Sequence, residues 1–212
     1  MTDWATISSL ATAGGTLILA IATFAAVRTA NKAARATERT LMASIRPVLM
    51  PARPQDPPEK IGFHDDHWLK VEGGYAGVEV TDEAIYLAIP LRNVGSGLAV
   101  LDRWDIYAER LMGGRASHHD PETFRRLTRD LYVPTNDNGF WQGALRDPDD
   151  PLFQQVRDAL EGRDAVTIDL LYGDHEGGQR TISRFTLLPR SDDDRWLAVV
   201  SRHWNIDRDD PR

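Results

Sequence analysis

The chain has 212 residues, no cysteine and a formal net charge of −7. The length suits one ordinary domain with an extra element, and a chain without cysteine has no disulfide framework, thiolate metal site or cysteine nucleophile. Five basic and two acidic residues lie in the first 46 positions, which leaves 20 basic and 30 acidic residues for the remainder. This acidic body argues against a main domain that binds nucleic acid, whose expected footprint is a basic face.

The first predicted element is a transmembrane helix over residues 4–27. Its 24 residues carry no charge, and they form a helix of roughly 36 Å, against a hydrocarbon core of about 30 Å. Nine are large apolar residues and the others are Ala, Gly, Ser and Thr, which suits a membrane helix with a small-residue packing face. A buried helix of a globular protein is one alternative. A cleaved signal peptide is another, but the segment lacks a basic n-region and a clean small-residue cleavage site.

The flanking charges predict the orientation of this helix. Asp3 is the only charge before it, and Trp4 stands where an interfacial aromatic anchor would lie. Four basic residues follow: Arg28, Lys32, Arg35 and Arg39. Because positive residues stay on the cytoplasmic side, we expect a single pass through the plasma (inner) membrane, with the N-terminus outside and the C-terminal body in the cytoplasm.

Residues 28–46 predict a basic helical stalk that continues the span. Good helix formers dominate and Gly is absent, while Pro47 disfavours helix at the residue before it. Small residues recur at alternating spacings of three and four along one face. This stripe predicts a homo-oligomer through the N-terminal helix, although a segment so rich in small residues also produces such a pattern by chance. The basic residues can contact anionic headgroups or form an ordinary solvated face.

Residues 47–206 predict a mainly β body with a proline-rich segment at 51–58, followed by a disordered tail over 207–212. Alternating apolar and polar residues favour strands near 48–50, 85–91, 99–109, 166–172, 180–188 and 196–200. Pro90 suggests an edge strand or a bulge. An acid followed by proline at 120–121 and at 150–151 predicts two short helices. Antiparallel strands with few helices predict a β-sandwich, immunoglobulin-like in shape.

Three segments carry a resemblance to known sequences: "IRPVL", "LRNVGSGLA" and "LLYGDHEGGQRTISRF". Together with the N-terminal span and basic stalk, they resemble a group of uncharacterised bacterial single-pass membrane proteins. Those proteins have a helical anchor and stalk followed by an immunoglobulin-like β domain. The turn residues of their pattern are here Asn93, Gly95, Gly97 and Ala99. The resemblance implies an architecture and carries no activity.

Two kinds of candidate site are present. His64, Asp65 and His67 in "HDDH" are candidate metal ligands, because two imidazoles and a carboxylate can bind zinc or iron. A solvated turn is the alternative for this stretch, and also for "SHHD" at residues 117–120. Phe140 and Trp141 predict an exposed aromatic pair on a loop, the kind of anchor that a binding surface uses.

The sequence contains no phosphate-binding Gly-Lys-Ser/Thr loop, dinucleotide fingerprint or nucleophile elbow. We therefore expect a non-enzymatic, membrane-tethered binding or adaptor module with no catalytic residue, no cofactor and no nucleic-acid partner. Its partners would be the lipid bilayer and an unidentified protein or a second copy of itself. The alternatives are an accessory subunit of a larger membrane complex and a membrane-anchored metal-dependent hydrolase that uses His64, Asp65 and His67.

Overall fold

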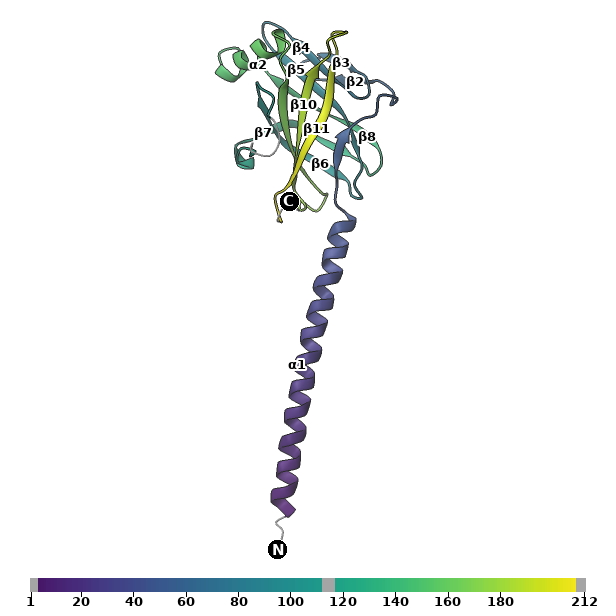
Figure 1. The fold of residues 1–212 in the computed structure, drawn as a ribbon, viewed down its shortest axis with the longest axis vertical. Helices are drawn as coiled ribbons and strands as arrows, with labels where there is room; N and C mark the ends of the chain where they lie inside the picture. The colour runs from purple at the N-terminus through teal and green to yellow at the C-terminus, as the bar shows by residue number, and fades with distance from the viewer. Residues whose placement is uncertain (1–3, 112–116, 209–212) are drawn as a thin grey trace. The chain divides into compact units, whose positions relative to one another are not determined.

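The computed structural model describes residues 4–111 and 117–208, in two compact units, 1–44 and 45–212. The first unit is the helix α1 (Trp4–Ser44), and the second contains the described strands, the helix α2 (Pro151–Glu161) and a single 3₁₀ turn, η1 (Pro121–Thr123) (Figure 1). The strands are β1 (Leu49–Pro51), β2 (Glu59–Gly62), β3 (Trp68–Val71), β4 (Tyr75–Val80), β5 (Ile85–Asn93), β6 (Ala99–Tyr107), β7 (Arg125–Val133), β8 (Asn138–Leu145), β9 (Val166–Gly173), β10 (Thr181–Pro189) and β11 (Trp196–Asn205).

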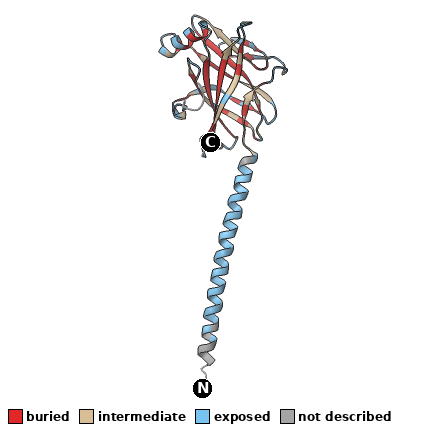
Figure 2. Ribbon diagram, in the orientation of Figure 1, coloured by how far each residue is buried: buried red, intermediate tan, exposed pale blue. Residues whose placement is uncertain are grey.

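The helix α1 is uninterrupted over 41 residues, as expected for a span and stalk that form one helix. It ends at Ser44, three residues before Pro47. Every side chain described in it is exposed within the unit (Figure 2). Among the described residues, α1 is the one helix long and apolar enough to cross a membrane, over Thr12–Met42. This suggests membrane anchoring, and a signal sequence would have the same features.

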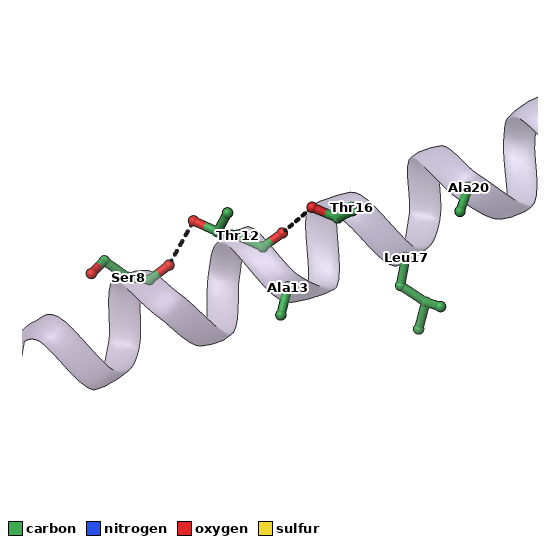
Figure 3. Close-up of a pocket in the computed structure, with 6 residues that line it drawn as sticks. All are labelled: Ser8, Thr12, Ala13, Thr16, Leu17 and Ala20. Atoms are coloured by element: carbon green, nitrogen blue, oxygen red, sulfur yellow. Dashed lines mark hydrogen bonds between the residues drawn. The ribbon is translucent and has the colours of Figure 1, made fainter.

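The threonines of α1 whose side chains the structure describes satisfy their hydroxyl groups inside the helix. Thr12 donates to the carbonyl of Ser8 (2.9 Å) and Thr16 to that of Thr12 (2.8 Å) (Figure 3). The same bond to the carbonyl four residues earlier is made by Thr23, Thr29, Thr37 and Thr40. A hydroxyl satisfied in this way needs no water. The threonines of the apolar segment are therefore compatible with a hydrocarbon surrounding.

The strands of the body form one curled, antiparallel nine-stranded sheet and a separate β2–β3 hairpin. In one half, β5 pairs with β8 on one side and with β4 and β1 on the other. In the other half the order is β11-β10-β9-β6-β7, and β4 joins the halves because it also pairs with β11. The predicted class, a long helix followed by a mainly antiparallel, sandwich-like β domain, is confirmed. The immunoglobulin-like shape stays a prediction.

The strand β5 is central in its half of the sheet, and both of its faces are covered by other parts of the body. Ile85, Leu87, Ile89 and Leu91 point into the main core with residues of β6, β8, β9, β10 and α2. On its other face, Tyr86 and Ala88 pack against the β2–β3 hairpin. Burial of each of the four Ile and Leu side chains contributes about 1.5–3 kcal/mol to the stability of the folded body.

Pro90 shows why β5 tolerates a proline at its centre. The predicted edge position is wrong, since β5 has partners on both sides. The pairing with β4 ends at Ala88 and the pairing with β1 begins at Leu91. Pro90 lies between these two partners, where its carbonyl still accepts the N–H of Ala52 (2.9 Å). The proline therefore occupies the one stretch of that side where β5 changes partner.

Other boundaries differ from the prediction in two ways. The apolar–polar pattern predicts no strand at β2, β3, β4, β7 or β8, which are short, rich in glycine or rich in charge. The predicted tail is wrong at its first residue, because Asp207 accepts three hydrogen bonds from Arg180 (2.7–3.0 Å). Residues 209–212 of that tail lie outside the described residues.

The side chain of Asn93 ties the start of the body to the end of β5. It is fully buried, and all four of its amide bonding positions are used. Its Nδ2 donates to the carbonyls of Gly97 (2.6 Å) and Val133 (3.0 Å). Its Oδ1 accepts the backbone N–H of Val48 (3.2 Å) and of Gly95 (2.9 Å). One amide thus joins three segments that are distant in the sequence.

The two glycines after Asn93 allow the backbone of residues 45–48 to lie directly on this turn. A Cβ on Gly97 would stand 1.7 Å from the carbonyl oxygen of Ile45, and one on Gly95 would stand 2.3 Å from that of Arg46. The backbones also bond directly, from Ser96 N–H to the Arg46 carbonyl (2.9 Å). We call the contacts between residues 45–49 and 93–97 the Asn93 clamp.

A chain of hydroxyl groups continues from the clamp into the sheet. The hydroxyl of Tyr172 accepts the N–H of Leu49 (3.1 Å) and lies 2.7 Å from Ser183 Oγ, which lies 2.6 Å from His203 Nδ1. Burial, and then the positive charge of Arg46, lower the pKa of His203 from its ordinary value of 6.5. His203 is therefore neutral in the folded body at neutral pH.

Replacing Asn93 with alanine should destabilise the body by about 3 kcal/mol or more. Two backbone N–H groups at partly buried positions and two buried carbonyls lose this hydrogen-bond partner. Urea unfolding of the full chain in mild detergent, followed by tryptophan fluorescence, measures this loss. Ser96→Ala, which removes an exposed hydroxyl from the same turn, should leave the midpoint unchanged. Equal midpoints for the two variants would contradict the clamp.

The neutral state of His203 should make the stability of the body depend on pH. Since its folded pKa lies below 6.5, the unfolded chain binds a proton first as the pH falls. Stability is then complete above about pH 6.5 and decreases below it, by at most about 1.4 kcal/mol per pH unit. His203→Asn should remove this part of the pH dependence in urea titrations at pH 5.5 and 7.5. His64→Asn, at a ring that is 61% exposed, should retain it.

Candidate functional site

The predicted metal ligands His64, Asp65 and His67 lie in the turn between β2 and β3. The carboxylate of Asp65 accepts hydrogen bonds from the hydroxyl of Tyr86 (2.9 Å) and from Nε of Arg146 (3.0 Å). Burial raises the pKa of Asp65, but these two hydrogen bonds outweigh it and lower that pKa to about 2. The carboxylate is therefore committed to protein partners.

The two histidines of this turn have different environments, one packed and one exposed to solvent. The ring of His67 stacks on Tyr86, with centroids 3.9 Å apart, and its Nε2 lies 3.2 Å from a carboxylate oxygen of Glu79. His64 is 61% exposed. In the part of the chain that the structure describes, no group of three or more His, Asp or Glu side chains could hold a metal ion. The turn acts as a packed connection that fixes the hairpin on β5.

The second histidine stretch, residues 117–120, lies against the outer face of the sheet. Asp120 caps η1, as predicted, by accepting the backbone N–H two residues on (3.0 Å). His119 Nδ1 lies 2.7 Å from a carboxylate oxygen of Asp105 on β6, and the ring of His118 meets Trp204 of β11 edge-on at 5.3 Å. These contacts hold the stretch on the sheet.

The outer face beneath this stretch contains a buried ion pair. Arg184 on β10 donates through Nε and Nη2 to the two oxygens of Asp169 on β9 (2.7 and 2.6 Å), and both side chains are almost fully buried. The guanidinium lies between the rings of Tyr107 (5.3 Å) and Trp204 (4.7 Å). Burial and the charge of Asp169 raise the pKa of Tyr107. The charges of Arg184 and Asp169 are paired with each other, so we assign this cluster a structural role.

The predicted exposed aromatic pair is wrong for Trp141. Residues 138–145 form the strand β8, paired along β5, and not a loop. Trp141 is fully buried, and its ring meets Trp104 edge-on at 5.2 Å. Phe140 is half-buried against the core, with the guanidinium of Arg129 5.1 Å from its ring. The pair offers no common exposed surface.

A small pocket lies between β7 and β8 and is lined mostly by polar and aromatic side chains. Its volume is about 100 Å³, and three of its lining residues are arginines. Other polar or aromatic walls come from Trp104, Thr128 and Gln142. The strands β7 and β8 follow each other in the chain, but each is paired with a different half of the sheet. The pocket lies where these two strands diverge.

The arginines of this pocket, which we call the arginine pocket, are Arg125, Arg126 and Arg146. Arg125 pairs with Asp150 (3.2 Å) and Arg146 with Asp65 (3.0 Å), and neither acid lines the pocket. Arg126 has no carboxylate within 4.0 Å among the described residues. The pocket therefore has an excess of positive charge within an acidic body.

The sequence pattern does not indicate that these three residues form a site. Arg125 and Arg126 adjoin each other in the chain, but Arg146 lies 20 positions further on, at the end of an unpredicted strand. An Arg-Arg pair in an acidic body is a weak signal that fits a solvated strand equally well. The convergence follows from the pairing of β7 with β6 and of β8 with β5, which the sequence pattern does not show.

The residues predicted to contact the membrane lie on α1. Trp4 begins the helix, but its side chain lies outside the described residues. Arg28, Lys32 and Arg35 line one shallow groove directly after the apolar segment, and Arg39 is exposed one turn further on. Within the described residues, none of these four cations has a carboxylate within 4.0 Å. Their charge is thus available to headgroups or to water.

Compared with known proteins, the chain matches no protein-family model, no curated protein sequence and no solved structure.

Replacing Asp169 with asparagine should destabilise the body by about 3–5 kcal/mol, because the charge of Arg184 would remain buried without its partner. Asp192→Asn is a matched control, since it also removes a carboxylate that accepts hydrogen bonds from an arginine, Arg190, but does so at an exposed site. It should cause little or no change. Denaturant unfolding of both variants measures the difference, and similar losses would contradict a structural role specific to the buried pair.

Proposed function

We propose that this chain is a membrane-tethered, non-enzymatic binding module. The observation that carries the proposal is a long helix with exposed apolar side chains, followed in the chain by a separate β body that has its own core. The large apolar residues exposed on the predicted span, residues 4–27 of the helix, are Leu10, Leu17, Ile18, Leu19, Ile21, Phe24 and Val27. Apolar surface of this extent requires a cover, which a bilayer supplies.

The arrangement of these residues favours lipid over a single protein partner. Leu17, Ile18 and Leu19 are consecutive, and successive helix positions point about 100° apart. The helix is thus apolar around its circumference, which is typical of a span. Small residues between them leave room for a second copy to approach closely.

The basic residues that follow the span support an orientation with the body in the cytoplasm. Arg28, Lys32 and Arg35 come within the first turns after the apolar stretch, in the region where the positive-inside rule applies. Tethering would raise the local concentration of the body for a partner at the membrane, and a self-associating helix would add avidity.

Cysteine labelling tests the anchor and its orientation. Because the chain has no cysteine, single cysteines can be placed at Thr2, ahead of α1, and at Ser191, an exposed position between β10 and β11. We expect a membrane-impermeant maleimide to label Thr2→Cys in intact cells and Ser191→Cys only after permeabilisation. Thr16→Cys, within the span, is the matched control and should remain unlabelled until detergent is added.

Two results would contradict this proposal in different ways. Labelling of Ser191→Cys in intact cells would reverse the orientation and place the body outside the cytoplasm. An intact mass that lacks the N-terminal segment through the predicted span, together with release from membranes by alkaline extraction, would identify a cleaved signal sequence. Retention of the full mass in the membrane pellet is the expected result.

A further inference from the structure

The arginine pocket is small and built from hydrogen-bond donors. Its volume of about 100 Å³ corresponds to roughly three water molecules at about 30 Å³ each, whereas pockets for whole drug-sized ligands measure about 300–1,000 Å³. It therefore has room for one functional group and not for a complete nucleoside or sugar. No carboxylate side chain lines it.

The donors of the pocket are held in place by residues outside it. Nε of Arg146 is bonded to Asp65, and Nη2 of Arg125 to Asp150, which leaves the other N–H groups of both guanidinium forks for a ligand. Gln142 is buried, and its Oε1 accepts a hydrogen bond from Arg129 (3.1 Å). Its Nε2 therefore remains as a donor at the pocket wall.

One lining residue of the pocket, Gly143, packs against two tryptophans. A Cβ on Gly143 would lie 2.5 Å from Cζ2 of Trp141 and 3.0 Å from Cζ2 of Trp104. The absence of a side chain at this position lets the two rings pack against each other beside the strand. The guanidinium of Arg125 lies over the Trp104 ring at 5.9 Å, a contact that restrains its orientation.

We propose that the arginine pocket binds a phosphate group, either as inorganic phosphate or as the end of a small phosphomonoester. Three guanidinium groups, an amide N–H₂ and the hydroxyl of Thr128 offer more donors than the two oxygens of a carboxylate can accept, whereas a phosphate has three or four oxygens. Arg126, which has no ion pair among the described residues, supplies the unneutralised charge. This names the ligand class of the binding module proposed above, and therefore rests on that proposal.

Calorimetric titration of the full chain with inorganic phosphate, in detergent and a phosphate-free buffer, tests the site. We expect one saturable site, and Arg126→Gln should weaken it at least tenfold. Arg53→Gln is the matched control, because Arg53 is an exposed arginine of the same body outside the pocket, and it should bind as the unmodified chain does. Arg126→Lys, which keeps the charge and loses the planar fork, should bind with intermediate affinity.

Competition experiments separate the ligand chemistries. Acetate at equal ionic strength should not displace phosphate, and displacement at similar concentrations would overturn the choice of phosphate over carboxylate. Absence of phosphate binding, or equal binding by the unmodified chain and Arg126→Gln, would overturn the site. Since Arg126 is exposed and has no ion pair among the residues that the structure describes, its substitution should not alter the urea midpoint, so a loss of binding reports on the pocket.

Two further probes distinguish the sources of the phosphate group. Glycerol phosphate represents a soluble phosphomonoester, and bilayer discs containing phosphatidic acid represent a lipid headgroup, with phosphatidylcholine discs as the blank. Binding of glycerol phosphate with the same sensitivity to Arg126→Gln is expected. Sensitivity confined to phosphatidic acid would overturn the soluble source. The cysteine labels report on the anchor without phosphate, so a failure of this site and a failure of the proposed tether are distinguishable.

Discussion

The contact on which the body depends is the Asn93 clamp. The first strand, β1, has only three residues, and so short a strand has few ladder hydrogen bonds of its own. The amide of Asn93 and the close backbone contact at Gly97 hold residues 45–48 in place. Once these residues are fixed, Leu49 lies in the core and its N–H meets the hydroxyl of Tyr172. The position where the body begins is thus set by a side chain and two glycines.

The clamp also affects how β5 pairs with its neighbouring strands. With β1 held beside the end of β5, and β4 beside its beginning, the strand changes partner at Pro90 without leaving its side uncovered. Its other side is then free to pair along its whole length with β8. Because β7 stays with β6, the two strands of the β7–β8 connection diverge and leave the arginine pocket between them. The pocket is therefore a consequence of the sheet topology and is not formed by a flexible loop.

The sequence predicted those parts of this structure that depend on local chemistry. Helix α1 follows from its propensity and from Pro47, the cap of α2 from Asp150 and Pro151, and the hairpin β9–β10 from its alternation and glycine-rich turn. The acidic or basic strands were missed, because β7 alternates charged residues with only a few apolar ones and resembles an exposed segment. Trp141 was misplaced for a related reason, since an aromatic residue beside a polar turn fits a loop surface and a buried strand equally well.

The candidate site was less predictable than the fold, because its residues come together from separate strands and do not form a motif in the sequence. "HDDH" has the composition of a metal site, yet Tyr86 and Arg146 bind Asp65 from residues 21 and 81 positions away. Arg146 also lines the arginine pocket, so one tertiary contact both occupies the predicted metal ligand and holds a residue of that pocket.

The charge of the body sharpens the selectivity expected of this pocket. An acidic surface repels anions in general, so a ligand gains only where the local field has the opposite sign. Of the three arginines, two are balanced by Asp65 and Asp150, and Arg126 alone supplies the excess. The two paired acids fix the geometry of their arginines and remove the charge that would attract a second anion. The net positive charge of the pocket is thus small enough for one small anion to neutralise it.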